Sequence, residues 1–289
     1  MPADAADASG LLYVLAPVHN RRALTERFIG CLKAQTDRDY RLVLIDDGST
    51  DGTAQMARAS GVPLSVISGR GDWWWGGALQ RGYAWLRVQP AYGGEVVLIM
   101  NDDTQFGPEF LAAGRAALAA APRSLLLARR HDARTGEFLD AGAKAVWSEL
   151  RFLPVRDPAE ADCFSTRGLF VRLEDFLALG GFHPVLLPHY ASDYEFTMRA
   201  RRRGYALVSD PAVRIGFDAA TTGDLDPGGR ALGDFLRRRF SKRSAHNPVY
   251  WTTFVLLACP AAWILPNLFR VWRDFLVQAW RAATSRAGA

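Results

Sequence analysis

A run of apolar residues that ends in adjacent acids constrains this chain more than any other feature. Residues 96–100 read Val-Val-Leu-Ile-Met, and Asn101, Asp102 and Asp103 follow at once. A short unbroken apolar run is typical of a strand buried on both faces, as in a parallel sheet. Open α/β sheets bind ligands at the carboxyl ends of their strands, so the two acids predict a site for a hard cation such as Mg2+ or Mn2+, with a substrate diphosphate. The alternative is a turn in which one acid caps the next helix.

The first 128 residues alternate between strand-like and helix-like segments. Apolar runs predict the strands, and a helical spacing of apolar residues predicts the helices between them. The strands are expected at 11–18, 40–45, 63–68, 95–100 and 125–128, and the longer helices at 22–35, 72–88 and 108–121. This alternation predicts one α/β domain, residues 11–233, with a mostly parallel Rossmann-like sheet and helices on both faces.

The pattern becomes irregular after Pro122. Turn signals predict an inserted hairpin or acceptor-side loop, and the Gly, Thr and Asp content near residue 220 predicts a mobile loop. The expected segments are a hairpin region at 129–158, strands at 162–171, 205–208 and 213–217, helices at 173–179 and 192–203, and the loop at 219–233.

Both ends of the chain differ from this domain in composition. Residues 1–10 are acidic and rich in alanine, and we expect them to be disordered. They lack the basic start of a signal peptide, so the apolar run after them is expected to be the first strand. The three cysteines are far apart, as expected for reduced thiols in a cytosol. Residues 234–289 form a basic and aromatic tail.

The tail contains a stretch, residues 247–269, that has no charged residue. It is long enough to span a bilayer, but Pro260 and Pro266 interrupt it and basic clusters flank it. We therefore favour helices that lie on a membrane surface, with a true span, a core-packing tail and a homodimer interface as alternatives. Because the acidic motifs precede Phe217, we expect the nucleotide fold to be independent of the tail.

A second acidic pair follows the strand predicted at 40–45. Asp46 and Asp47 precede Gly48, which permits a tight turn before the next helix. A carboxylate in this place can accept a hydrogen bond from a base N–H or a ribose hydroxyl, and the alternative is an ordinary helix cap. We expect the two acidic motifs at the ends of neighbouring strands, which indicates a nucleotide site.

In order and spacing, five short motifs together resemble the family 2 inverting glycosyltransferases, which have the GT-A fold. They are Pro17–Asn20, Asp46–Ser49, Asn101–Asp103, Gly180–Phe182 and Ser192–Glu195, within a resemblance that covers about residues 11–217. The resemblance implies one nucleotide-binding α/β domain that uses a nucleoside-diphosphate sugar.

The resemblance also implies roles for individual residues. Asp103 matches the metal ligand, for Mg2+ or Mn2+, with Asp102 beside it on the sugar or ribose. Asp193 matches the catalytic base, and the alternative from the residues alone is a cap for the helix at 192–203. Asp47 matches the aspartate that binds the nucleobase. The remaining matches are Pro17 and His19 in the nucleotide pocket, and Gln80 and Gly82 in the helix under the diphosphate.

Two departures from the family pattern qualify these roles. Asn101 replaces the first acid of the Asp-x-Asp motif, which predicts weaker metal affinity. Ser192 replaces the usual Glu before the base, which leaves the base assignment to Asp193 alone. The Gln-x-x-Arg-Trp motif of processive members is absent, which resembles enzymes that add one sugar per encounter.

The segment 71–77 contains three consecutive tryptophans. They cannot all face one core, so we expect at least one indole to face the cleft, and we place Asp72 and Trp75 with Asp46 among the donor-binding residues. The alternative is packing at a strand–helix corner. Similar segments occur in rhamnosyltransferase-like members, which makes dTDP-rhamnose the first expectation for the donor.

These observations predict an inverting glycosyltransferase for cell-surface polysaccharide synthesis. It would move one sugar to a lipid-linked or glycan acceptor, and it would be cytoplasmic, peripheral on the inner face of the cell membrane, with no nucleic acid partner. A sugar-nucleotide pyrophosphorylase is the enzymatic alternative, but the glycine-rich loop after its first strand is missing here. A sugar-nucleotide-binding scaffold subunit without catalysis is the other alternative.

Overall fold

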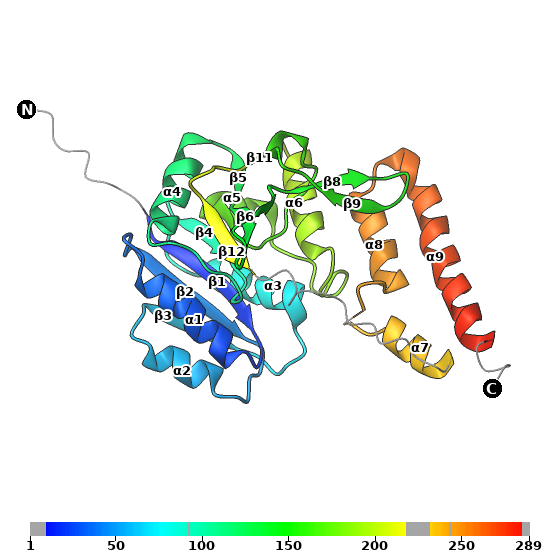
Figure 1. Ribbon diagram of the computed structural model, residues 1–289, viewed down its shortest axis with the longest axis horizontal. Helices are drawn as coiled ribbons and strands as arrows, with labels where there is room; N and C mark the ends of the chain where they lie inside the picture. The colour runs from blue at the N-terminus through cyan, green and yellow to red at the C-terminus, as the bar shows by residue number, and fades with distance from the viewer. Residues whose placement is uncertain (1–9, 92, 218–231, 243, 285–289) are drawn as a thin grey trace, which may run out of the picture.

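The computed structural model describes residues 10–91, 93–217, 232–242 and 244–284 (Figure 1). The predicted disorder before Gly10 and most of the predicted loop at 219–233 fall outside the described residues. The described chain is built on a seven-stranded sheet with the order β11-β5-β10-β4-β1-β2-β3. Its strands are β1 (Leu12–Val18), β2 (Tyr40–Asp46), β3 (Leu64–Ser68), β4 (Val96–Ile99), β5 (Ser124–Leu127), β10 (Leu169–Arg172) and β11 (Ala206–Val208).

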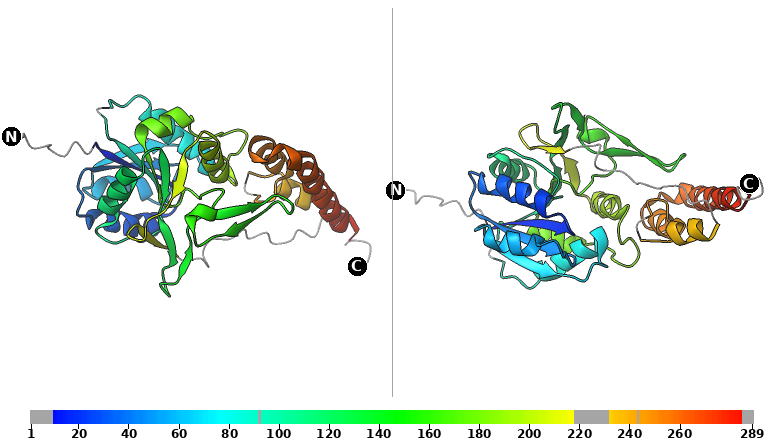
Figure 2. Two further views of the ribbon diagram at one scale, coloured as in Figure 1. Left: turned by 90° about the horizontal axis from the view of Figure 1, so that it is seen from above. Right: turned by 60° about the horizontal axis from the view of Figure 1, so that its bottom comes forward.

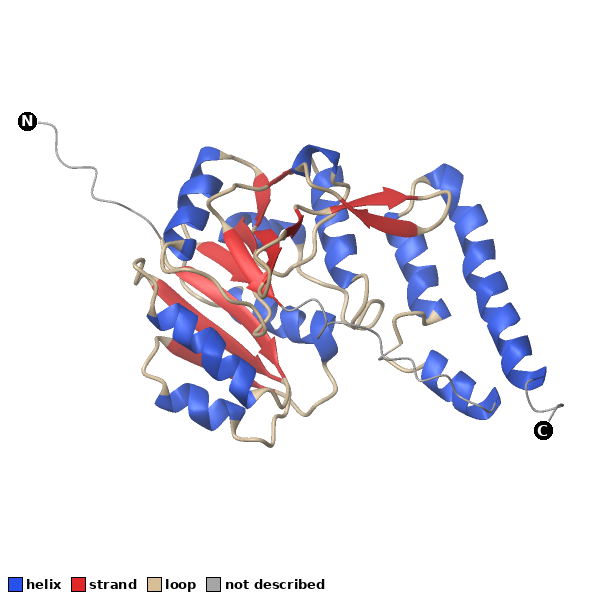
Figure 3. Ribbon diagram, viewed as in Figure 1, coloured by secondary structure: helices blue, strands red, loops and turns tan. Residues whose placement is uncertain are grey.

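Helices cover both faces of this sheet, as the sequence predicted (Figure 3). Side chains alternate along β1: Leu12 and Val14 pack on one face and Tyr13 and Leu15 on the other. The first face is covered by α1 (Arg22–Lys33), α2 (Thr53–Ala59) and α4 (Phe110–Ala120), and the second by α3 (Trp74–Leu86), α5 (Leu173–Leu179) and α6 (Ser192–Arg202). Burial on both faces explains the unbroken apolar runs of β1, β2 and β4.

The order of the strands corrects one expectation. The acidic motifs follow β2 and β4, and these strands are not neighbours, because β1 lies between them and pairs in parallel with both. Strand β10 is antiparallel to β4 and β5 and lies between them, so its first residue, Leu169, lies opposite Ile99 at the end of β4. The start of β10 therefore meets the carboxyl end of β4.

The region predicted as an inserted hairpin forms two small sheets. One joins β12 (Arg214–Phe217), β6 (Arg129–Asp132) and β7 (Phe138–Asp140), and the other is the hairpin of β8 (Ala143–Val146) and β9 (Arg151–Pro154), before a 3-10 turn at Pro158–Glu160. Gln105, just beyond β4, bridges to Gly216 of β12, which holds the first small sheet beside the end of β4.

The tail forms α7 (Leu232–Arg239), α8 (Pro248–Ala258) and α9 (Ala261–Thr284) at one end of the molecule, beyond α6 and the β8–β9 hairpin (Figures 1 and 2). No helix in the described part of the chain combines the length and apolar content needed to cross a bilayer.

The expectation that the fold is independent of the tail is wrong for α8. Phe254 of this helix is fully buried, in a cluster with Leu187, Met198 and Cys163 of the α/β domain. Its ring also packs edge-on against Phe152 of β9, 5.7 Å between centroids. The core-packing alternative therefore holds for α8, and the domain boundary expected at residue 234 separates parts that share one core.

Candidate active site

The acids beyond β4 form a closed network. Asp102 Oδ1 pairs with Arg21 Nε at 3.1 Å, and Asp102 Oδ2 accepts a hydrogen bond from Thr25 Oγ1 at 2.9 Å. Asp103 Oδ2 pairs with Arg21 Nη2 at 3.1 Å, and Asp103 Oδ1 pairs with Arg167 Nη1. Every carboxylate oxygen of the pair thus has a partner.

Three elements bring these partners together. Arg21 lies in the turn after β1, Thr25 on the first turn of α1, and Arg167 two residues before β10. The β1–β4 and β10–β4 registers place both arginines at the carboxyl end of β4. Burial raises the pKa of Asp102 to about 6, against the opposing effects of Arg21 and Thr25. This carboxyl therefore depends on its partners to remain ionised at neutral pH.

The acid pair fits a divalent cation only if the substrate supplies ligands too. The part of the chain that the structure describes holds no group of three or more His, Cys, Asp or Glu residues that could bind a metal by itself. Mg2+ and Mn2+ prefer oxygen ligands and are commonly held by one or two carboxylates plus substrate phosphates. Asp103, which is 8% exposed, offers hard oxygens of this kind.

The second acidic motif holds a loop in place. Asp47 Oδ1 accepts a hydrogen bond from the Gly71 amide at 2.8 Å, and Oδ2 accepts from the amides of Trp73 and Trp74 at 2.8 and 3.2 Å. The Asp47 carbonyl oxygen lies 2.6 Å from His19 Nδ1. The carboxylate therefore ties the tryptophan-rich segment to the end of β2, beside the end of β1.

The Asp46 side chain stabilises a turn, which the sequence left open as the alternative to nucleotide binding. Its Oδ1 accepts a hydrogen bond from the Ser49 amide at 2.9 Å, as in an Asx-turn. Gly48 has φ +75, and a Cβ there would lie 2.7 Å from the Gly71 nitrogen, so the turn requires glycine. Pro17 lies in β1, paired with Ile45 of β2.

Gln80 and Gly82 of α3 have packing contacts. Gln80 Oε1 accepts a hydrogen bond from the Phe182 amide at 2.7 Å, which fixes the Gly-Gly-Phe turn after α5. Gly82 lies against Ile45 and Leu15, where a Cβ would come within 2.8 Å of Ile45. Their predicted roles under the diphosphate remain predictions.

The three tryptophans have different polar and aromatic contacts, and a place for one of them in the cleft stays a prediction. Trp73 lies under the Arg81 guanidinium, 5.1 Å from its ring centroid, and Trp74 packs edge-on against His189 at 5.7 Å. Trp75 donates a hydrogen bond from Nε1 to Thr166 Oγ1 at 3.1 Å. Asp72 is exposed, and its carbonyl oxygen accepts a hydrogen bond from Lys242 at 3.2 Å.

Asp193 lies in the first turn of α6. The residue before the helix is Ala191, so Asp193 is not the helix cap that the sequence left as an alternative. Burial raises its pKa to about 6, while the amides of Tyr194 and Thr166 and the charge of Arg130 oppose the rise. A carboxylate with this pKa is ionised at neutral pH and is a stronger base than an exposed aspartate.

Thr166 and Arg167 connect the acid pair to Asp193. Thr166 contacts Trp75 through its hydroxyl, its amide lowers the pKa of Asp193, and the next residue pairs with Asp103. The sequence reasoning missed both residues, together with Arg21 and Arg130. A local signal existed only for Arg21, which stands three residues after β1.

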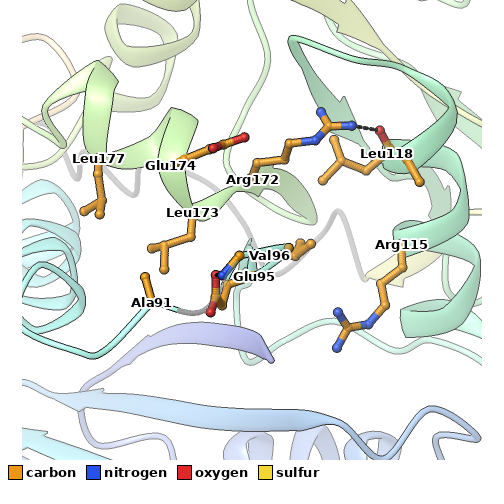
Figure 4. A pocket seen from close by; sticks show the side chains of 12 residues that line it. Ala91, Glu95, Val96, Arg115, Leu118, Arg172, Leu173, Glu174 and Leu177 are labelled. Carbon is orange, nitrogen blue, oxygen red and sulfur yellow. Dashed lines mark hydrogen bonds between the residues drawn. The ribbon is translucent and has the colours of Figure 1, made fainter. Parts of the chain in front are cut away.

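A cavity of about 630 Å3 lies at the opposite edge of the sheet (Figure 4). It is next to the amino end of β4 and contains Glu95, Arg115, Arg172 and Glu174. Arg115 pairs with Asp37, and Arg172 donates hydrogen bonds to carbonyl oxygens at the end of α4. These arginines stabilise contacts between segments that are distant in the sequence. None of the predicted site residues lines this cavity.

The chain is similar to a family model and to several known proteins. A model of the family described as glycosyl transferase family 2 matches residues 13–174. N-acetylglucosaminyl-diphospho-decaprenol L-rhamnosyltransferase of Mycobacterium tuberculosis is 30% identical over 119 residues, which is 39% of this chain and 39% of that protein. Validoxylamine A glucosyltransferase of Streptomyces hygroscopicus subsp. jinggangensis is 45% identical over 51 residues, 17% of this chain and 12% of the relative.

Two solved structures share the fold. The mannosyltransferase PcManGT from Pyrobaculum calidifontis, in complex with GDP-Man and Mn2+, has a TM-score of 0.57 at 18% identity, covering 96% of this chain and 76% of the other. GalNAc-T7 with UDP, GalNAc and Mn2+ has a TM-score of 0.61 at 17% identity, covering 93% and 55%. At these identities the likeness concerns the fold.

Proposed function

Because the chain belongs to glycosyl transferase family 2, we propose that it transfers one sugar, with inversion, from a nucleoside-diphosphate sugar to an acceptor hydroxyl. The observation that carries the proposal is the placement of two carboxylates on different elements beside the carboxyl end of β4. Asp103 lies at the end of β4, and Asp193 lies at the start of α6, joined to it through Arg167 and Thr166.

On this proposal the donor lies across the carboxyl ends of β2, β1 and β4. Asp103 would hold Mg2+ or Mn2+, and the ion would stabilise the negative charge that develops on the leaving diphosphate. The loop that Asp47 holds, with the three tryptophans, forms the part of the pocket that binds the nucleobase. The proposed donor-binding residues are Pro17, His19, Asp46, Asp47, Asp72, Trp75, Gln80 and Asp102.

Asp193 is the proposed general base. Inversion needs a base on the acceptor side of the sugar, opposite the leaving group, and the separation of Asp193 from Asp103 by Thr166 and Arg167 supports this division. The Asp193 carboxylate would accept the proton of the acceptor hydroxyl while the oxygen attacks the anomeric carbon.

The donor sugar and the mode of transfer are finer points of the proposal. We propose dTDP-rhamnose as the first donor to test, supported by the mycobacterial rhamnosyltransferase and the tryptophan-rich segment. The glucosyltransferase relative makes a glucose donor the second choice. The absence of the Gln-x-x-Arg-Trp sequence supports one transfer per encounter.

A lipid-linked or glycan acceptor at the cytoplasmic face of the cell membrane completes the proposal. One face of α9 carries apolar side chains at helical spacing, each 39–77% exposed: Leu265, Phe269, Trp272, Leu276 and Trp280. Arg273 and Arg281 lie beside this stripe in the sequence, which favours an anionic lipid surface over a second copy of the chain.

Product analysis tests the proposed chemistry. Wild type with a nucleotide-sugar panel and Mn2+ should release nucleoside diphosphate by slow hydrolysis, faster when the acceptor is present. A scaffold subunit would bind a donor and release none. Family membership gives no support to the pyrophosphorylase alternative.

A further inference from the structure

The two arginines that close the Asp102–Asp103 pair come from positions far apart in the sequence. Arg167 is 11% exposed and Asp103 8%, so their ion pair is largely shielded from solvent. Arg21 is 36% exposed and contacts both acids. A charged group at such depth destabilises the fold when it loses its partner.

The charges of this cluster balance. Two carboxylates face two guanidiniums. A divalent ion on Asp103 would bring two further positive charges beside two guanidiniums at low solvent exposure, which is unfavourable. A diphosphate that arrives with the ion restores the balance, because it supplies a negative charge on each phosphate. The ion and the diphosphate should therefore bind together.

We propose that Arg167, assisted by Arg21, exchanges partners during donor binding. Without donor, its guanidinium neutralises Asp103; with donor, the carboxylate turns to the divalent ion and the guanidinium to the diphosphate. The inference rests on the proposed function and assigns these arginines the roles of keeping the empty site neutral and binding the leaving group.

The surroundings of Arg167 suit such an exchange. Its guanidinium lies over the Phe217 ring, 4.5 Å from the centroid. The ring contacts the flat face of the guanidinium, so the N–H groups at its edge are available to bind either a carboxylate or a phosphate. The backbone beside it is fixed, because the Gly168 amide donates to Ile99 of β4 and the Gly168 carbonyl accepts from Ala128. The side chain can therefore move while its Cα stays at the end of β4.

Equilibrium binding of Mn2+ alone, and of dTDP or UDP with Mn2+, tests the exchange. Wild type should bind Mn2+ about tenfold more tightly when the nucleoside diphosphate is present. Arg167→Met should bind Mn2+ alone about tenfold more tightly than wild type, since a competing cation is gone, and the nucleoside diphosphate about tenfold more weakly. The affinities of Arg167→Lys should lie between those of wild type and Arg167→Met, because lysine keeps the positive charge but lacks the paired N–H groups of a guanidinium.

Shifts of opposite sign are the signature, since general damage to the site would weaken both ligands. Arg151→Met is the control, because Arg151 pairs with Glu149 on the surface and should change neither affinity. If Arg167→Met fails to fold by circular dichroism, Arg21→Met must show the same opposite shifts. Unchanged or jointly weakened binding would overturn the exchange. A wild type that binds neither nucleotide would contradict the proposed function itself.

Discussion

At the scale of single residues, the burial of Asp193 suits the proposed role as a base but lowers the stability of the fold. An ionised carboxylate that is withdrawn from water lowers the stability of the fold, and the raised pKa of Asp193 measures that effect. Sequence reasoning weighed Asp193 as a helix cap, but Ala191 precedes the helix. The base assignment stays a prediction with consequences for activity and for stability.

Asp193→Asn should abolish transfer and keep donor binding. Losing a general base typically costs at least about 100-fold in rate, and Asn keeps the size of the side chain. Transfer assays and donor calorimetry on the same preparation measure the two effects. Transfer at the wild-type rate would remove Asp193 from the mechanism.

The same variant makes a stability prediction. The folded-state pKa of Asp193 lies above its ordinary 3.8, so the ionised group destabilises the fold above about pH 6, by at most about 3 kcal/mol, and this effect vanishes below about pH 4. Asp193→Asn should equal or exceed wild type in melting temperature at pH 8 and lose that advantage at pH 4. A lower melting temperature at pH 8 would indicate a structural role instead.

The pH dependence of the transfer rate follows from the same pKa. Below about pH 6 Asp193 is protonated and cannot accept a proton, so kcat should rise with pH through about 6 and then level off. Rates at saturating donor and acceptor give the profile. If kcat is already constant between pH 5 and 7, the group that limits the rate has an ordinary carboxyl pKa, and the raised pKa of Asp193 does not govern transfer.

At the scale of elements, α8 shows where the sequence misleads. This helix is apolar on all sides, and such a helix fits a protein core and a membrane equally well. Packing against α6 and the β8–β9 hairpin places Phe254 in the core and leaves Leu256 58% exposed.

Phe254→Ala should therefore lower the free energy of unfolding by about 3–5 kcal/mol, because it leaves a cavity beside the helix that carries Asp193. Leu256→Ala, on the same helix, should change it by less than about 0.5 kcal/mol. Urea denaturation compares the two variants. Equal effects would mean that α8 is not part of the core.

The strands and most helices could be predicted from the sequence, because a parallel sheet buried on both faces leaves apolar runs with helices between them. The neighbours of β4 could not. Chain order does not reveal that β1 separates β2 from β4, or that β10 enters the sheet in the opposite direction. For that reason Arg167, which lies 64 positions from Asp103 in the sequence, gave no local signal.

At the scale of the whole molecule, the seven-stranded sheet and α9 lie at opposite ends, with α6 and α8 between them (Figures 1 and 2). Phe269 and Trp280 are 69% and 67% exposed. Burying each in lipid would contribute about 1.5–3 kcal/mol, and nearby arginines about 1 kcal/mol each at an anionic surface.

Phe269→Glu combined with Trp280→Glu should reduce flotation with anionic liposomes at least about tenfold. Val88→Glu, a substitution of an exposed residue after α3, should leave flotation unchanged. Unaltered flotation of the double variant, or its conversion from dimer to monomer in light scattering, would assign the stripe to another partner.

The central claim is that a nucleoside-diphosphate sugar and a divalent ion bind together at the carboxyl end of β4. Calorimetric titration of the nucleotide sugar that wild type prefers, with and without Mn2+, tests it on Asp103→Asn and on Glu174→Ala, which alters the cavity at the opposite edge. The account predicts that Asp103→Asn loses the Mn2+-dependent affinity by at least about tenfold while Glu174→Ala binds as wild type. Unchanged binding by Asp103→Asn, or loss of binding in Glu174→Ala, would contradict it.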